Sequence, residues 1–553
     1  MGTILPMSFS EKDEEPGWGG DRPSTDRKPP PKDQMTTTHH DYIIIGSGIA
    51  GLYAALLAKD HIARLGGSVL VLTKGSIDDC NTRWAQGGIA APVGPEDSPQ
   101  THLRDTIAAG AGLVDEEAAR VLTEEAPARI DDLVRFGVPF DTVEGRIALA
   151  REGAHSLPRV LHAGGDSTGQ HIELTLSSVA KQQGITVLEN TIATEILLNA
   201  TSTRATGIRA LDTGTGETTD YSCRFLVLAT GGAGQLYRFS TNPEVATGDG
   251  IALAYRAGAE IMDMEFFQFH PTALTLPGVR AFLISEAMRG EGGILRDVNS
   301  VAFMAEYDER AELAARDIVA RAILDRMQKT GADHVLLDIT HLDAKLLIAR
   351  FPQIYRFCLD NGIDITTDAI PVSPAAHYTM GGIRTNTWGE TTLPGLYAAG
   401  ECACTRVHGA NRIASNSLLE SIVFAGRAIR RTVDSPDTVA TPSDGTVDLQ
   451  AATPAEAGVP TREALQSLMW DNVGILRNAE TLALSSATLA AWQTTLGAAT
   501  DRPTQELADL LTCARLVTEA AVLREESRGA HHRTDFPKPR NDWRRHLIFK
   551  HRQ

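Results

Sequence analysis

Five short stretches of the chain gather histidine, arginine, glutamate and hydroxyl side chains, the types that can hold a small anionic ligand. They lie at residues 266–272, 285–293, 315–318, 375–382 and 408–417. Glycines flank several of these stretches, and glycine lets a backbone approach a ligand closely at an entropic cost. We therefore expect the stretches to meet at one binding site.

Three of the candidate side chains also have ordinary structural interpretations. His270 taken alone is typical of a core histidine whose ring nitrogens are satisfied by its neighbours. Arg316 beside Asp317 on a helix is usually a surface ion pair, worth about 0–1 kcal/mol. His377 closely follows Pro374 and fits a turn. These residues taken one at a time leave both interpretations open.

The element that organises the chain is residues 41–52, with the sequence DYIIIGSGIAGL. An isoleucine-rich run ends at Gly46 and a helical apolar pattern follows at once, which predicts a strand, a tight turn and a helix. Gly46 permits the turn, Gly48 lets the backbone approach a pyrophosphate, and Gly51 lets the helix pack against the strand. The helix N-terminus then presents unpaired N–H groups to the phosphates. This pattern predicts a dinucleotide-binding βαβ unit.

Two further strand ends refine the prediction of the cofactor. The apolar run at 69–72 ends in Thr73 and Lys74, where dinucleotide-binding domains usually carry an acidic residue for the ribose hydroxyls. This departure weakens an NAD-binding interpretation. A second buried strand runs into the pair Gly231 and Gly232, another turn of close approach. Together the two glycine turns favour a flavoprotein whose sheet wraps the ADP half of FAD.

The bulk composition excludes several classes of function. A net charge of −18 argues against nucleic acid or an anionic membrane as a partner. The six cysteines include no C-x-x-C pair, so we expect reduced thiols, no metal site and no disulfide framework. No apolar stretch reaches the roughly 18 residues of a membrane span, and no signal-peptide pattern opens the chain. We therefore expect a cytoplasmic protein.

A chain of 553 residues is too long for a single core. We expect an α/β fold, with a Rossmann-like FAD-binding domain, an inserted α+β capping domain and a C-terminal helical bundle. The expected segments are a disordered extension at 1–36, a discontinuous FAD-binding domain at 37–260 and 379–440, a capping domain at 261–378, a linker at 441–458, the bundle at 459–530 and a tail at 531–553.

Ten motifs, in order along the chain, resemble those of a known family: GSGIAG, AQGGIAA, LATGGAG, QFHPT, EAMRGEGG, ARDIVARAI, AAHYTMGGI, LYAAGE, GANRIASNSLLE and SRGAHHRTDFP. From about residue 41 to 536 the chain resembles the succinate dehydrogenase/fumarate reductase flavoprotein superfamily, and within it the bacterial L-aspartate oxidases. Asn81 stands where respiratory members carry the histidine that bonds to flavin, which implies non-covalent FAD. Glu152 would pair with the ammonium group that distinguishes aspartate from succinate.

The resemblance also implies the residues of the two binding sites. Arg316 and Glu152 would be the catalytic pair, with Arg316 nearest the reacting carbons. The substrate carboxylates would be held by Gln268, His270, Ser285, Glu286, His377 and Arg412. FAD would be bound by Gly46, Ser47, Gly48, Gly51, Thr73, Lys74, Asn81, Gln86, Gly87, Gly88, Thr230, Gly231, Asp249, Glu401, Ser415, Ser417 and Leu418. Ser285 replaces the threonine usual in L-aspartate oxidases and keeps its hydroxyl.

The activity implied is oxidation of L-aspartate to iminoaspartate, with O2 or fumarate as electron acceptor and a hand-off of the product to quinolinate synthase in NAD biosynthesis. Two alternatives stay open. One is a fumarate reductase or succinate dehydrogenase type of flavoprotein. The other is a flavin-binding scaffold without turnover, against which the arginines and histidines of residues 261–378 argue.

Overall fold

A sheet of seven strands organises the part of the chain that the computed structural model describes, residues 38–63, 66–435, 438–449 and 458–552. Its strand order is β8-β2-β1-β11-β10-β9, and β19 also pairs with β11. The strands are β1 (Thr38–Ile45), β2 (Val69–Leu72), β8 (Thr186–Leu188), β9 (Thr191–Leu198), β10 (Ala205–Asp212), β11 (Thr218–Leu228) and β19 (Leu396–Ala398). The central pairs are parallel, with Ile43 opposite Leu226. The predicted extension at 1–36 lies outside the described residues.

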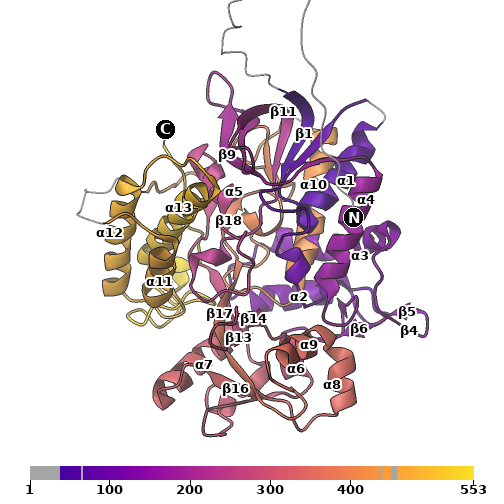
Figure 1. Ribbon diagram of the computed structural model, residues 1–553, viewed down its shortest axis with the longest axis vertical. Helices are drawn as coiled ribbons and strands as arrows, with labels where there is room; N and C mark the ends of the chain where they lie inside the picture. Colours follow the sequence, from indigo (N-terminus) through magenta and orange to yellow (C-terminus); the bar gives the residue numbers. More distant parts are fainter. Residues whose placement is uncertain (1–37, 64–65, 436–437, 450–457, 553) are drawn as a thin grey trace, which may run out of the picture. The chain divides into compact units, whose positions relative to one another are not determined.

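Alternate residues of the central strands enter two different cores. Ile44 and Val71 pack against α1 (Ile49–Ile62), α3 (Glu116–Phe136), α4 (Thr168–Gln182) and α10 (Asn416–Asp434). Ile43 and Leu72 pack on the opposite face, where α5 (Asp249–Arg256) and the C-terminal helices lie (Figure 1). A parallel sheet covered on both faces reads as a continuous apolar run, as residues 43–45 and 69–72 do.

Short elements between α1 and α4 complete this part of the chain. They are α2 (Pro99–Ala109), β3 (Ile89–Ala90), β4 (Thr142–Val143), β5 (Arg146–Ile147), β6 (Leu149–Ala150) and β7 (Val160–Leu161). Strands β3, β7 and β6 form a small sheet beside the loop that contains Glu152.

A second sheet, of order β14-β13-β17-β16-β15, has its own hydrophobic core (Figure 1). Its elements are β13 (Phe267–Leu274), β14 (Phe282–Leu283), α6 (Glu286–Gly290), β15 (Ile294–Arg296), α7 (Arg316–Thr330), β16 (Val335–Asp338), α8 (Ala344–Arg350), α9 (Pro352–Asp360) and β17 (Ile370–Thr379). The register of the β13–β17 pair shifts between His270 and Ala273. Pro271 lies within that shift, since proline cannot donate to the ladder.

The C-terminal part contains the helices α11 (Arg462–Val473), α12 (Ala479–Thr495) and α13 (Arg502–Leu523). The last residues form β21 (Ile548–Phe549), which pairs with β12 (Ile261–Met262) in a sheet with β18 (Gly382–Arg384) and β20 (Ala403–Cys404). Residues 450–457 of the predicted linker lie outside the described residues. The structure has a Rossmann-like sheet, a second α+β sheet region and C-terminal helices. The predicted α/β fold class is therefore confirmed.

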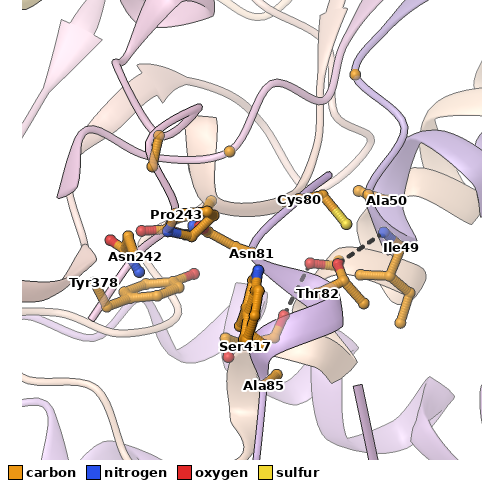
Figure 2. A pocket seen from close by; sticks show the side chains of 18 of the residues that line it. Ile49, Ala50, Cys80, Asn81, Thr82, Ala85, Asn242, Pro243, Tyr378 and Ser417 are labelled. Carbon is orange, nitrogen blue, oxygen red and sulfur yellow. Dashed lines mark hydrogen bonds between the residues drawn. The ribbon is translucent and has the colours of Figure 1, made fainter. Parts of the chain in front are cut away.

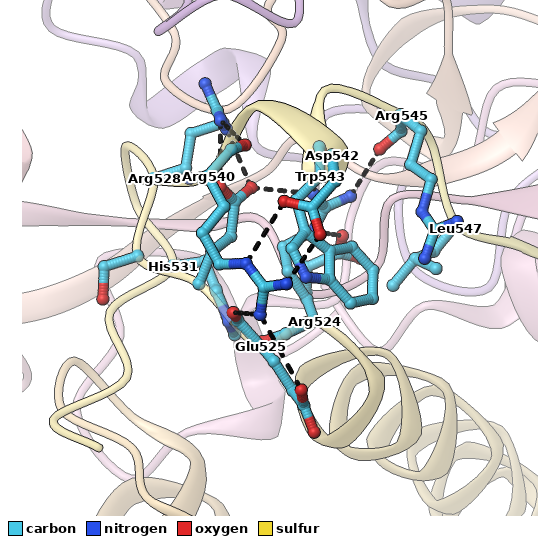
Figure 3. Close-up of polar contacts among 12 residues, drawn as sticks. Arg524, Glu525, Arg528, His531, Arg540, Asp542, Trp543, Arg545 and Leu547 are labelled. Atoms are coloured by element: carbon cyan, nitrogen blue, oxygen red, sulfur yellow. Dashed lines mark hydrogen bonds and ion pairs between the residues drawn. The ribbon is translucent and has the colours of Figure 1, made fainter. Parts of the chain in front are cut away.

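A buried group of ions fixes the segment after α13, and we call it the C-terminal arginine cluster: Arg524, Arg528, Glu265 and Glu526. Its two arginines are labelled in Figure 3. Arg524 Nε donates to Glu265 Oε1 at 2.5 Å, and its remaining nitrogens donate to Glu526 and to the carbonyls of Trp543 and Arg545. The cluster thereby ties the C-terminal residues to the start of β13.

Among the described helices, none is long and apolar enough to cross a membrane.

Candidate functional site

A large cavity lies where the ends of β1, β2 and β11 approach the second sheet and the start of α10. It holds about 1630 Å³ of space between protein atoms, counting its open mouth. Figure 2 shows how separate segments meet there: Asn81 and Thr82 lie close to Asn242, Tyr378 and Ser417. Because parallel strands share their carboxyl edge, the sequence segments that follow them are brought together at this cavity.

The glycine turn after β1 forms one wall of the cavity. Gly46 has a φ of +107°, and a Cβ there would lie 2.2 Å from the carbonyl oxygen of Ala229. A Cβ at Gly51 would lie 1.9 Å from the carbonyl oxygen of Gly46, so Gly51 serves helix packing and does not line the cavity. The N-cap of helix α1, Gly48, has no side chain to cap the helix, and the positive end of α1 faces the cavity.

Three polar atoms in the wall test whether a dinucleotide fits this cavity. Asn81 Oδ1, Gln86 Oε1 and Thr230 Oγ1 are buried and have no hydrogen-bond partner among the described residues. All three side chains line the cavity next to the glycine turn. Buried polar groups in proteins are nearly always hydrogen-bonded, so these atoms fit a polar ligand that reaches along the wall. A dinucleotide cofactor supplies such groups beside the helix N-terminus.

The end of β2 differs from the usual dinucleotide-binding pattern. Lys74 Nζ lies 2.7 Å from Asp249 Oδ2 and 3.0 Å from Glu506 Oε1. Its charge is therefore balanced by two carboxylates of α5 and α13. Lys74 ties the sheet to these helices, and its side chain also lines the cavity. Because two carboxylates already balance its charge, Lys74 attracts a ligand phosphate only weakly.

Glu401 lies farther along the cavity, where its carboxylate bridges two segments. Its Oε1 accepts from the Thr379 backbone N–H at 3.0 Å, and its Oε2 accepts from Asn81 Nδ2 at 3.0 Å. Burial raises the pKa of Glu401 to about 7, despite these hydrogen bonds. The side chain can thus exchange a proton near neutral pH.

At the far end of the cavity two arginines from different elements converge on one glutamine. Arg316, the first residue of α7, donates from Nη1 to Gln268 Oε1 at 3.0 Å and from Nε to Glu286 Oε2 at 2.6 Å. Arg412 donates from Nε to the same Gln268 oxygen at 3.3 Å and from Nη1 to Ser417 Oγ at 2.7 Å. Arg316 is buried and does not pair with Asp317, so it is not a surface ion pair.

The prediction that Gln268 contacts the substrate requires a correction. Gln268 does not line the cavity but lies behind the wall, 1% exposed. Its amide nitrogen also donates to the Arg412 carbonyl at 2.8 Å. Gln268 therefore positions Arg316 and Arg412, because its side chain is fully used by protein partners.

Two histidines lie beside the arginines, with ring centroids 5.1 Å apart. His270 Nδ1 lies 3.2 Å from both the backbone nitrogen and the carbonyl oxygen of Thr272. His377 Nδ1 lies 2.9 Å from Thr241 Oγ1. Burial and the neighbouring Arg316 hold the pKa of His270 well below 6.5, and burial and Arg412 do the same for His377. Both rings are therefore neutral hydrogen-bond donors at neutral pH.

This end of the cavity carries an excess of positive charge. Burial and the nearby Arg316 lower the pKa of Arg412 to about 10. Burial likewise lowers the pKa of Arg289, whose nearest carboxylate, Glu286, is shared with Arg316. Burial opposes the ionisation of Glu286, but Arg316 and Arg289 outweigh it and lower its pKa. Arg316 and Arg289 thus share one carboxylate and Arg412 has none among the described residues, an arrangement that favours an anion.

Glu152 brings a second carboxylate to the same cavity. It is 5% exposed, and its Oε2 accepts from Ser415 Oγ at 2.6 Å. Ser415 has a φ of +61° at the N-cap of α10, and its carbonyl accepts from the Ala90 N–H. Glu152 Oε1 has no hydrogen-bond partner among the described residues. Although burial opposes it, the neighbouring His162 lowers the pKa of Glu152 to about 2.

Most of the residues expected from the sequence line this one cavity; Gly51 and Gln268 do not. Those in its wall are Gly46, Ser47, Gly48, Thr73, Lys74, Asn81, Gln86, Gly87, Gly88, Glu152, Thr230, Gly231, Asp249, His270, Ser285, Glu286, Arg316, His377, Glu401, Arg412, Ser415, Ser417 and Leu418.

Sequence reasoning missed several residues that hold these side chains in place. Thr241 contacts His377, and the turn signal of the following Asn242 and Pro243 could have drawn attention to it. Tyr378 lies under the Arg412 guanidinium, 4.2 Å from ring centroid to Cζ. Thr82 Oγ1 accepts from the Ile49 backbone N–H at 3.0 Å, and nothing in its sequence context signals this role.

Comparison with known proteins identifies two families that together match most of the chain. Residues 41–418 match the model of an FAD-binding domain family, and residues 462–553 match the fumarate reductase flavoprotein C-terminal family. The chain is 43% identical to an L-aspartate oxidase of Synechocystis, covering 93% of this chain and 98% of the relative. It is 44% identical to an L-aspartate oxidase of Streptomyces coelicolor, covering 92% and 91%.

A solved structure extends the comparison to the fold. The FrdA chain of E. coli quinol fumarate reductase superposes with a TM-score of 0.84 at 30% identity, covering 93% of this chain and 94% of that chain. The matches span the glycine turn, the second sheet and the C-terminal helices alike. The chain therefore belongs to the succinate dehydrogenase/fumarate reductase superfamily of FAD-binding flavoproteins and, within it, to the L-aspartate oxidase family.

Proposed function

We propose that this protein is an FAD-dependent oxidase that converts L-aspartate to iminoaspartate. The observation that carries the proposal is the charge pattern at the far end of the cavity. Arg316 and Arg412 offer two buried guanidinium groups, and Glu152 offers a buried carboxylate with one free oxygen. L-Aspartate carries two carboxylates and one ammonium group, which complement this pattern charge for charge.

Each side chain has a separate part in holding the substrate. Arg412 grips one carboxylate, since a planar guanidinium can donate two parallel hydrogen bonds. His270 and His377 add two imidazole rings to the carboxylate site, and Ser285 contributes its hydroxyl. Arg316, fixed by Glu286 and Gln268, lies nearest the two central carbons and orients them.

The reaction removes two electrons and two protons from the substrate. The bond between C2 and hydrogen breaks with its electron pair, the ammonium group loses protons, and a C=N bond forms. Bound FAD supplies the two-electron acceptor, and the cofactor-binding residues expected from the sequence hold it without a covalent bond. Glu152 holds the nitrogen of the substrate. The N-terminus of α10, which begins after Ser415, adds a partial positive charge to the cavity.

Electrons then leave to O2 or to fumarate, which fits the same pair of arginines as aspartate does. Iminoaspartate would pass to quinolinate synthase in the first steps of NAD biosynthesis. A cytoplasmic location stays an expectation from the sequence.

An anaerobic spectrum of the FAD-loaded protein tests the proposal. We expect L-aspartate to bleach the flavin absorbance band and succinate to do so weakly or not at all. Bleaching by succinate alone would support the fumarate reductase alternative instead. Acid precipitation adds a second check, because Asn81 cannot form a covalent flavin bond and all flavin should stay in the supernatant.

Substitution of Glu152 tests the source of specificity. Glu152→Gln keeps the shape of the side chain and removes its charge. A hydrogen bond to a charged group is worth about 1.5–3 kcal/mol, so kcat/KM for L-aspartate should fall roughly 10- to 150-fold. Fumarate reduction should change little, since fumarate has no ammonium group. A parallel loss of both activities would mean that Glu152 supports the site in general.

A further inference from the structure

We propose that His162 is a positioning residue that controls how much negative charge Glu152 can offer to the substrate ammonium group. The inference rests on the proposed function and concerns a side chain that lies outside the cavity wall. His162 follows β7, is 5% exposed, and places its Nε2 3.6 Å from Glu152 Oε1.

The two oxygens of Glu152 have different neighbours. Oε2 is held by the Ser415 hydroxyl at 2.6 Å. Oε1 has no hydrogen-bond partner in the described part of the chain, and His162 Nε2 lies 3.6 Å from it. Gly87 lies next to both Ser415 and Glu152, since a Cβ at residue 87 would lie 3.6 Å from Ser415 Oγ and 3.8 Å from Glu152 Oε1. Oε1 therefore lies between the imidazole and the space open to a ligand.

Two other titratable groups, His155 and Glu286, act on Glu152. Neither can change the charge available at Glu152 as His162 can. Both ring nitrogens of His155 have partners. Its Nε2 contacts the Ala414 carbonyl at 2.9 Å, and its Nδ1 accepts from Arg159 Nη1 at 3.0 Å. Burial lowers the pKa of His155, which keeps that ring neutral. Glu286, across the cavity, has its charge balanced by Arg316.

The protonation state of His162 then decides how Glu152 binds. A neutral imidazole with its proton on Nε2 orients Oε1 and leaves the carboxylate a full negative charge for the substrate. A protonated imidazolium cancels that charge and competes with the ammonium group for the same oxygen. Acidification should therefore weaken the binding of L-aspartate and leave ligands without an ammonium group unaffected.

Steady-state kinetics of the FAD-loaded enzyme between about pH 5.5 and 8.5 test this inference. In the native enzyme KM for L-aspartate should rise as the pH falls, while KM for fumarate should not. His162→Gln keeps an N–H donor that cannot be protonated, so the rise should disappear. His162→Leu places an apolar side chain beside Oε1, which disfavours the carboxylate, and should raise KM for L-aspartate about tenfold at every pH.

Two controls separate this role from a structural one. His171→Gln makes the same change on α4, outside the cavity, and should keep the native pH profile. The dissociation constant of succinate, read from the flavin difference spectrum, should be equal in all variants. A structural role would instead change succinate binding and both activities together.

The outcomes distinguish the two proposals. If the native enzyme binds succinate but does not oxidise L-aspartate, the proposed function fails, and the inference about His162 falls with it. If L-aspartate is oxidised and His162→Gln keeps the acid rise in KM, or His162→Leu leaves KM unchanged, only the role of His162 is overturned.

Discussion

The C-terminal arginine cluster and the far end of the cavity both bury arginines, but they balance the charge differently. In the cluster, two arginines meet two carboxylates, and Arg524 donates to four acceptors at 2.5–3.0 Å. At the cavity, Arg316 and Arg289 share Glu286, Arg412 has no carboxylate partner among the described residues, and two nitrogens of Arg289 have no hydrogen-bond partner there either.

The pKa values of the two groups follow this balance. Burial alone would lower the pKa of Arg524, but Glu265 and the neighbouring acids outweigh it and raise the pKa. For Arg412, burial and the repulsion from Arg316 act in the same direction and lower the pKa to about 10. A balanced group of buried ions stabilises the fold, whereas an unbalanced one is stabilised when an anionic ligand binds.

The largest effect is expected at the unbalanced site. Arg316→Leu should lower kcat for L-aspartate oxidation and for fumarate reduction by about 10²–10³-fold, because both reactions involve the same two carbons. Stopped-flow reduction and steady-state rates would measure this. Fumarate reduction close to the native rate would show that Arg316 has no part in the reaction.

The balanced cluster should respond in stability instead of activity. Arg524→Met leaves Glu265 buried without its ion partner, whereas Glu526 keeps Arg528, and the change should cost about 3–5 kcal/mol of unfolding free energy. Urea unfolding of the FAD-loaded protein would measure the loss, with Arg540→Met as the exposed control. KM of the folded fraction should stay native, and a raised KM would argue against the distinction between the two groups.

A smaller effect is expected for Arg412, the arginine that we propose grips a substrate carboxylate. Arg412→Lys replaces a planar fork by a point charge and should raise KM for L-aspartate by roughly 10- to 100-fold. The unfolding free energy should change far less than in Arg524→Met, because Arg412 is not paired with a carboxylate in the described part of the chain. FAD content measured by absorbance should stay native. An unchanged KM would remove Arg412 from the substrate site.

The smallest effect concerns a buried acid without a partner. Neither oxygen of Glu173 has a hydrogen-bond partner among the described residues, and burial raises its pKa to about 8. Below pH 4.5 folded and unfolded states both hold the proton; between about 4.5 and 8 only the folded state does, so stability falls as pH rises. Glu173→Gln should remove part of this fall, seen as a Tm higher by a few °C near pH 8. Identical Tm profiles would show that Glu173 is solvated or paired.

The sequence predicts the cofactor end of the site well, because the signals there are local. A strand, a glycine turn and a helix are neighbours in the chain, so Gly46 and Gly48 reveal their place by spacing alone. The same holds for Gly231 after β11 and for Ser417 at the start of α10.

The substrate end is only partly predicted, since its residues come from five separate segments. Histidine, arginine and glutamate types were visible in the sequence, but Gln268 was placed in the wall and lies behind it. Whether a polar side chain faces a ligand or a neighbouring arginine depends on the bulged β13–β17 pairing, which no local pattern specifies.

By itself the sequence determined the α/β class, the dinucleotide turn and the residue types of the site, because hydrophobic periodicity and glycine spacing are properties of contiguous residues. Only the tertiary structure decided how the charges are balanced. The ion pair between Arg316 and Glu286 joins residues 30 apart, and the hydrogen bond between Glu152 and Ser415 joins residues 263 apart. Such partners are chosen by the packing of the two sheets against α10, so their pKa values could not be anticipated from the chain alone.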